Sequence, residues 1–207
     1  MSYIISKITK KFHQKFIYNG RMTQLHHHLS EIIKKFHCKE ILDIGAGDGK
    51  IDNMLQESTG VNISGVDVYV REKTYIPVQK YDGKHLDLSD NNIDTVMLID
   101  VLHHTDNPED VFKEAVRVAN RYIIIKDHIQ HGLVSYIKLR IMDFVGNKPY
   151  GVSLPYHYLT PKQWRRLFRQ NNLEMVYMKG NLQLYRGIFS SLFDSNLHFI
   201  AVLRKRG

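Results

Sequence analysis

Between residues 40 and 126, short apolar segments alternate with longer stretches of helical periodicity. This alternation constrains the fold more than any other feature, because strands separated by helices are typical of a parallel sheet with helices on both faces. The segments that read as strands are residues 40–45, 62–67, 76–80, 93–99 and 122–126. Pro77 favours an edge position for the third segment, where its missing N–H group costs no ladder hydrogen bond.

The two ends of the chain add helices and two further strands. Apolar residues recur at helical spacing in residues 1–19 and 23–37, with a break at Asn19-Gly20. Asn107-Pro108 and Thr160-Pro161 predict two helix starts, residues 132–145 another helix, and residues 173–178 and 197–203 two strands antiparallel to one another. We therefore predict an α/β fold with a mostly parallel seven-stranded sheet and helices on both faces. Residues 1–39 are expected to form an N-terminal helical extension or lid, and residues 40–207 the main domain.

Charge and cysteine content limit the setting of the protein. The net charge of +8 is uneven, because residues 1–40 and 160–207 are strongly basic and the middle of the chain is acidic. The basic ends suit an anionic partner, or they merely keep exposed helices in solution. The single cysteine, Cys38, excludes an intramolecular disulfide and a cysteine-based zinc knuckle. With neither a secretory signal nor an apolar run of the ~20 residues that span a bilayer, we expect a cytoplasmic protein.

A glycine-rich segment, Asp43-Ile-Gly-Ala-Gly-Asp-Gly49, follows the first predicted strand, where parallel sheets bind ligands. Its spacing differs from the G-x-G-x-x-G dinucleotide motif, and Asp48 in the turn would repel a pyrophosphate. An acid before the first glycine suits an ammonium group instead. Asp67 ends the second strand, where a carboxylate can accept both hydroxyls of a ribose. The predicted ligand thus has a ribose, a cationic amino-acid end and no pyrophosphate, and S-adenosylmethionine satisfies all three conditions.

Four motifs in order resemble those of the class I S-adenosylmethionine-dependent methyltransferases, in particular the branch that acts on small molecules and quinones. They are residues 43–49, Gly65-Val-Asp67, Tyr81-Asp82-Gly83 and residues 93–104. The resemblance implies a Rossmann-like fold and S-adenosylmethionine as cofactor. It assigns the ribose to Asp67 and the adenine amino group to Asp82. Its full set of cofactor contacts is Asp43, Gly45, Gly47, Asp67, Val68, Asp82, Gly83 and Asp100.

Three histidines are the candidate catalytic residues, since they follow the fourth and fifth strands. His103 and His104 allow three interpretations: a general base for O-methylation, a divalent metal site shared with Asp100, or a structural role. His104 is favoured as the base because the family's histidine falls there. His128 is an equal alternative as base. We predict no bound metal ion.

Tyr156, His157 and Tyr158 lie in a loop rich in aromatic residues and form the predicted substrate wall, unless they only pack on the sheet. The fourth strand lacks the Asn/Asp-Pro-Pro-Tyr/Phe segment of enzymes that methylate the amino groups of bases. We therefore expect methyl transfer to a small organic or lipid-like acceptor, at oxygen or carbon.

Residues 1–20 carry an apolar stripe with lysines, so they suit a lid over the acceptor or a peripheral membrane contact. The basic ends leave open an RNA methyltransferase, although no RNA-binding module is visible and nucleic acid is the less favoured partner. A non-catalytic S-adenosylmethionine-binding protein is a further alternative. An NAD-dependent oxidoreductase fits the sequence worst.

Overall fold

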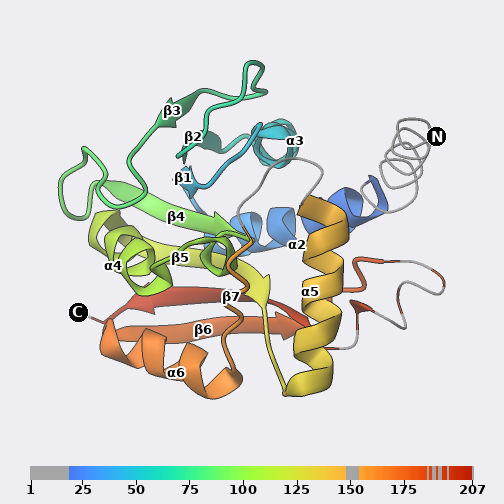
Figure 1. The fold of residues 1–207 in the computed structure, drawn as a ribbon. Helices are drawn as coiled ribbons and strands as arrows, with labels where there is room; N and C mark the ends of the chain where they lie inside the picture. The colour runs from blue at the N-terminus through green and yellow to red at the C-terminus, as the bar shows by residue number, and fades with distance from the viewer. Residues whose placement is uncertain are drawn as a thin grey trace.

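The computed structural model describes residues 19–147, 154–185, 187, 190, 193, 194 and 196–206. Its strands are β1 (Glu40–Ile44), β2 (Asn62–Asp67), β3 (Val78–Lys80), β4 (Ile93–Ile99), β5 (Ala119–His128), β6 (Leu173–Gly180) and β7 (His198–Lys205). They form one sheet in the order β3-β2-β1-β4-β5-β7-β6 (Figure 1). Strands β1 to β5 are parallel, while β7 runs antiparallel to both β5 and β6. The predicted α/β fold is confirmed, including the edge position of β3.

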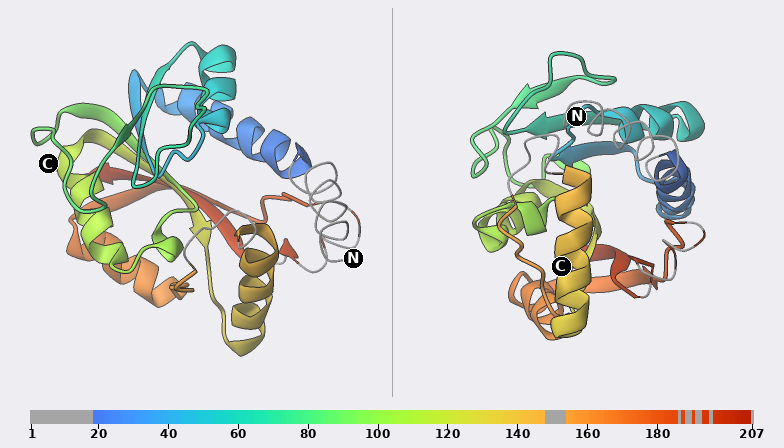
Figure 2. Two further views of the ribbon diagram at one scale, coloured as in Figure 1. Left: turned by 45° about the horizontal axis from the view of Figure 1, so that its top comes forward. Right: turned by 45° about the vertical axis from the view of Figure 1, so that its right-hand side comes forward.

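Alternate residues of the central strands point to opposite faces of the sheet, and different helices cover each face. Ile123 and Ile125 of β5 belong to a core with α4 (Pro108–Val118) and α6 (Pro161–Gln170). Ile124, between them, belongs to a second core with α2 (Asn19–Phe36) and α3 (Lys50–Thr59). Figure 2 shows these two layers on either side of the sheet. The all-apolar strand sequences follow from this burial on both faces.

The N-terminal helix differs from the prediction, because α2 includes Asn19-Gly20 instead of beginning after them. Met22 and Leu25 are buried, so the apolar stripe extends one turn further toward the N-terminus than expected. A Cβ at Gly20 would meet nothing within 4 Å, so no packing contact depends on a side chain at this position. The helix predicted over residues 1–19 lies outside the described residues except for Asn19.

The other helix starts follow their predicted signals. Pro108 begins α4, but Asn107 caps it through its backbone carbonyl, which accepts from Asp110 N and Val111 N, and not through its side chain. Thr160 and Gln163 form a reciprocal capping box at the start of α6.

Helix α5 (Leu133–Asn147) lies beside the edge at which β4 and β5 end (Figure 1). Its buried Leu139 packs with Tyr158 and Leu197 in a small separate core. The helix thereby closes the end of the sheet where the predicted site residues gather. None of the described helices is both long and apolar enough to cross a bilayer.

Candidate cofactor and catalytic site

The loop after β1 turns through left-handed backbone conformations that favour glycine. Gly45, Gly47 and Gly49 have φ values of +83°, +61° and +71°. A Cβ at Gly45 would lie 2.6 Å from Val101 Cγ2, so this glycine also permits close packing against the segment after β4. A Cβ at Gly47 would meet nothing within 4 Å. The middle of the loop therefore opens onto space, as a ligand-binding loop must.

Asp67 holds this loop in place. One oxygen, Oδ2, accepts a hydrogen bond from Gly47 N at 2.8 Å, and Oδ1 accepts from Tyr69 N at 2.9 Å. The next residue, Val68, is 55% exposed and lies against Gly83, where a Cβ would be 3.1 Å from Val68 Cγ1. The ends of β2 and β3 thus bring three of the predicted cofactor residues, Asp67, Val68 and Gly83, to the glycine loop.

Asp82 lies in the turn after β3 and is exposed. Its Oδ1 accepts hydrogen bonds from Lys84 N and His85 N, which lower the pKa of its carboxyl group. That oxygen already stabilises the turn. The predicted bond from Asp82 to an adenine amino group remains a prediction.

Asp43 is buried at the end of β1 and faces a second buried acid, Asp52 of α3, within hydrogen-bonding reach. A hydrogen bond between two carboxyl groups requires a proton on one of them. Burial first, and then the charge of Asp52, raise the pKa of Asp43 well above its usual value, and burial raises the pKa of Asp52 to about 7. Among the described residues, Asp43 Oδ1 has no hydrogen-bond donor. A buried acceptor of this kind suits the ammonium group of S-adenosylmethionine, so the loop fits that cofactor.

A cluster of polar side chains fills the space where β4 and β5 end. Its members are Asp100 and His103 after β4, Lys126, Asp127 and His128 at the end of β5, Asp143 of α5, Tyr158, and His198 of β7. Polar groups are costly to bury unless they are paired, so their arrangement is informative.

His103 is the centre of the cluster. Its Nδ1 donates to Asp127 Oδ1 at 2.6 Å, and its Nε2 lies 3.6 Å from Asp143 Oδ2. Burial opposes the charge of His103, but the carboxylate of Asp127 outweighs burial and raises the pKa of His103. In the same pair, burial opposes ionisation of Asp127, and the charge of His103 prevails and lowers its pKa. The pair with Asp127 therefore stabilises the imidazolium form of His103.

His128 is in the opposite state. Its Nδ1 lies 3.2 Å from His103 Nδ1, and its ring is buried. Burial and the charge of His103 lower the pKa of His128 well below its usual value. His198 is also buried, with its Nδ1 3.3 Å from Lys126 Nζ, and burial and Lys126 lower its pKa likewise. Both rings are thus neutral.

Asp100, with φ of +56°, pairs with Lys126 and with Arg21 of α2. Burial opposes its ionisation, but Lys126 and then Arg21 lower its pKa below the usual value. The role of Asp100 in cofactor binding remains a prediction. The ion pair with Arg21 connects α2 to the site.

Four donor groups of this cluster lie within 4.8 Å of one another, as a metal site requires: Asp100, His103, Asp127 and His128. The set considered from the sequence was Asp100, His103 and His104. Among the described residues, Asp100 and His103 belong to the group above, whereas His103 and His104 form a second group with Asp143. Lys126 and Arg21 neutralise Asp100, and Asp127 accepts a hydrogen bond from Nδ1 of His103, which keeps its proton. The absence of a metal ion stays a prediction, which these pairings support.

The predicted substrate residues surround one cavity of about 480 Å³. It lies between residues 156–159 and the N-terminal end of α4, and Tyr156, His157 and Tyr158 all line it. His157 Nδ1 is 2.8 Å from Thr105 O, which fixes the segment next to His104. The Tyr158 hydroxyl donates to Asp143, so this residue connects the cavity wall to the buried cluster.

His104 is the candidate catalytic histidine that remains partly exposed. Its ring centroid is 4.0 Å from that of His103. Sequence reasoning placed all three histidines here but missed Arg21, Asp143 and His198, which come from distant parts of the chain. Lys126 was the sequence signal for such a buried polar cluster, because a lysine inside an apolar strand needs a buried partner.

Known proteins are similar to part of this sequence and share the fold of this chain. Residues 42–122 match the family model described as a methyltransferase domain. No curated protein matches the chain significantly.

Among solved structures, magnesium protoporphyrin IX methyltransferase from Synechocystis PCC 6803 is 16% identical, with a TM-score of 0.64 over 94% of this chain and 88% of that one. The YcgJ protein of Bacillus subtilis is 16% identical, with a TM-score of 0.62 over 88% and 99% of the two chains. A S-adenosylmethionine-dependent methyltransferase of Methanosarcina mazei is 20% identical, with a TM-score of 0.57 over 81% and 92%. These likenesses concern the fold.

Proposed function

We propose that the chain, whose residues 42–122 match a methyltransferase domain, is a class I S-adenosylmethionine-dependent methyltransferase. In this proposal it methylates an oxygen atom of a small organic or lipid-like acceptor, with His104 as the general base. When bound, S-adenosylmethionine supplies an electrophilic methyl group and leaves as a neutral thioether. The residues of this chain have to align the acceptor and remove its proton. Transfer to an acidic carbon of the acceptor is compatible with the same base.

The observation that carries the proposal is the different state of the three histidines. His103 already donates its Nδ1 proton to Asp127, and His128 is enclosed. His104 lies in the short turn Leu102–His104 after β4, partly exposed, next to the segment that lines the cavity. It is thus the histidine that an acceptor can reach, and it would take the hydroxyl proton while the oxygen forms its bond to the methyl carbon.

The cavity supports an uncharged or weakly polar acceptor. Tyr156, Tyr158 and Leu159 give it aromatic and apolar walls, and Gln163 offers hydrogen bonds. Glu109 and Asp110 lie at its α4 side and would repel a phosphorylated acceptor. A phenol, an enol or a quinol head group fits this lining.

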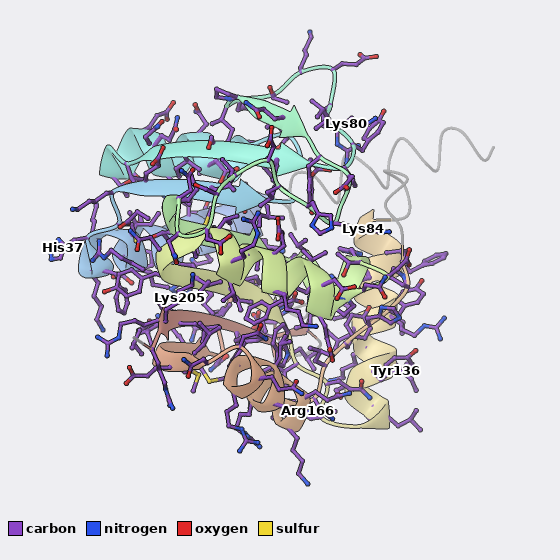
Figure 3. The ribbon with its side chains drawn as sticks, turned by 90° about the vertical axis from the view of Figure 1, so that its left-hand side faces the viewer. His37, Lys80, Lys84, Tyr136, Arg166 and Lys205 are labelled. Carbon is purple, nitrogen blue, oxygen red and sulfur yellow. The ribbon has the colours of Figure 1, made fainter. Side chains whose placement is uncertain are left out.

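The proposal is tested with isotope-labelled S-adenosylmethionine and a panel of phenols, quinols, hydroxy acids, amines and RNA. Magnetic resonance of the labelled carbon distinguishes O-methyl, C-methyl and N-methyl products. We expect O-methylation of an uncharged acceptor, and His104→Gln should reduce kcat by about a hundredfold or more without weakening binding of S-adenosylhomocysteine. His37→Asn is the matched control, because His37 is exposed at the opposite end of the molecule (Figure 3). An N-methyl product, methylated RNA or full activity of His104→Gln would contradict the proposal.

We further propose that residues 1–20 act as a lid over the acceptor. Support comes from Arg21, since its ion pair with Asp100 fixes the start of α2 beside the site. Limited trypsin digestion at Lys7, Lys10, Lys11 and Lys15 tests it. We expect slower cleavage when S-adenosylhomocysteine and acceptor are bound, whereas an unchanged cleavage rate would contradict the lid proposal.

A further inference from the structure

Helix α5 exposes a row of large apolar side chains to solvent. Leu133 is 73% exposed, Val134 71%, Ile137 49% and Ile141 52%. Positions 133, 137 and 141 follow one another at the spacing of a single helix face, and position 134 borders them. Surface residues of this kind usually occur singly, so a continuous row indicates a contact.

The row is not required by the interior of the protein. The opposite face of α5 carries the buried Leu139 and Asp143, which pack with Tyr158 and the polar cluster. The helix is therefore apolar on both sides. Its inner side meets the site, while its outer side faces away from the sheet (Figure 2).

The two charged residues of α5 that border the row are both basic. At 3.6 residues per turn, Lys138 and Arg140 flank the row on its two sides. Arg140 lies over the rings of Tyr136 and Tyr156, at 5.7 Å and 4.4 Å from their centroids. The one carboxyl group of α5, that of Asp143, is buried.

We propose that the outer face of α5, formed by Leu133, Val134, Ile137 and Ile141 between Lys138 and Arg140, lies on an anionic membrane surface. An apolar row with flanking cations suits a helix that lies in the plane of the interface, with its apolar side among the acyl chains and its cations at the phosphates. The net charge of +8 acts in the same direction. Docked in this way, the protein would turn the edge carrying His103 and His104 toward the bilayer, where a lipid-like acceptor resides.

The test measures co-sedimentation of the full chain with two kinds of vesicle, pure phosphatidylcholine and phosphatidylcholine mixed with phosphatidylglycerol. It requires no acceptor and no turnover, so its result is independent of the proposed reaction. We expect binding to the mixed vesicles that decreases with salt, because the phosphate contacts are screened. Leu133→Gln combined with Ile137→Gln should reduce the partition coefficient about tenfold, and Arg140→Glu should reduce it by a similar factor.

The matched control is Met175→Gln combined with Met178→Gln, since these side chains are 45% and 50% exposed on β6 instead of α5. This control should bind vesicles as the native chain does. S-adenosylhomocysteine affinity and the unfolding midpoint of every variant are measured as well, because a general loss of structure would change them. Binding to neither vesicle, or equal binding by the α5 variants, would overturn the proposal. A dimer that the α5 substitutions dissociate, without vesicle binding, would assign the face to a second copy and overturn it too.

Discussion

At the scale of single residues, the cofactor loop depends on the protonation of two facing acids. Asp43 must be ionised to hold an ammonium group, yet burial and the charge of Asp52 raise its pKa. The affinity for S-adenosylhomocysteine should therefore rise as the pH increases through the raised pKa of Asp43.

Replacing Asp52→Asn removes the like charge and offers Asp43 an amide donor. The pKa of Asp43 then falls, and we expect the pH dependence of S-adenosylhomocysteine binding to move to lower pH. Isothermal titration calorimetry across this range measures the shift, with Asp87→Asn as an exposed control. The same pH profile in Asp52→Asn and the native chain would show that Asp43 does not titrate with the ligand.

Asp67 holds the glycine loop, and the predicted ribose contact depends on the same carboxylate. Its carboxylate accepts from Gly47 N and Tyr69 N, and it is predicted to accept the ribose hydroxyls. Asp67→Ala should weaken S-adenosylhomocysteine binding by about tenfold to a hundredfold, the equivalent of about 1–3 kcal/mol for unpaired polar groups. Asp67→Asn keeps one acceptor oxygen and should lose less. An unchanged dissociation constant in Asp67→Ala would refute the ribose assignment.

Residues in the glycine loop could be predicted from the sequence because their constraint is local. Gly45 and Gly49 need left-handed backbone angles within one short turn, and Asp67 has a fixed place at the end of β2. The partners of Lys126 could not be found in this way. Asp100 and His198 reach it from β4 and β7, and only the register of the folded sheet brings them together.

At the scale of the element, α2 raises the question of where the domain begins. The helix was predicted as part of an extension ending at residue 39, a boundary that remains a prediction. Leu25, Leu29 and Ile32 are nevertheless buried in the core shared with α3 and the sheet. A helix held this way should unfold together with the sheet.

Leu29→Ala tests this cooperativity. Leu29 is fully buried, so truncation should lower the free energy of unfolding by about 2–5 kcal/mol. Urea unfolding followed by both circular dichroism and the fluorescence of Trp164, which lies on α6, should give one coincident transition at a lower midpoint. Separate transitions for the two signals would instead make α2 a detachable extension.

Element boundaries show what a sequence pattern leaves out. The end of β2 and the whole of β4 follow the predicted ranges, since their apolar residues coincide with the buried segment. Strand β5 is longer than predicted and continues through Asp127 and His128. These polar residues looked like loop residues because a single sequence does not reveal that β7 would pair with them and bury them.

At the scale of the whole molecule, the polar cluster joins β4, β5, β7 and α5, so its titration should act on global stability. His128 and His198 stay neutral when folded but take up protons below about pH 6.5 when unfolded. Their contribution to stability is therefore lost as the pH falls below that value. The pH dependence from His103 has the opposite sign. Because folding raises its pKa, His103 contributes stability that is lost as the pH rises from about 6.5 through the pKa of the folded state.

His198→Gln isolates one of these effects, because glutamine keeps a polar group near Lys126 but does not titrate. The difference in unfolding free energy between this variant and the native chain should change by up to about 1.4 kcal/mol per pH unit below pH 6.5. Urea unfolding at a series of pH values measures it. His131→Gln, which changes an exposed histidine, should give a curve parallel to that of the native chain. A parallel curve for His198→Gln as well would mean that folding does not lower the pKa of His198, contrary to the burial beside Lys126 described above.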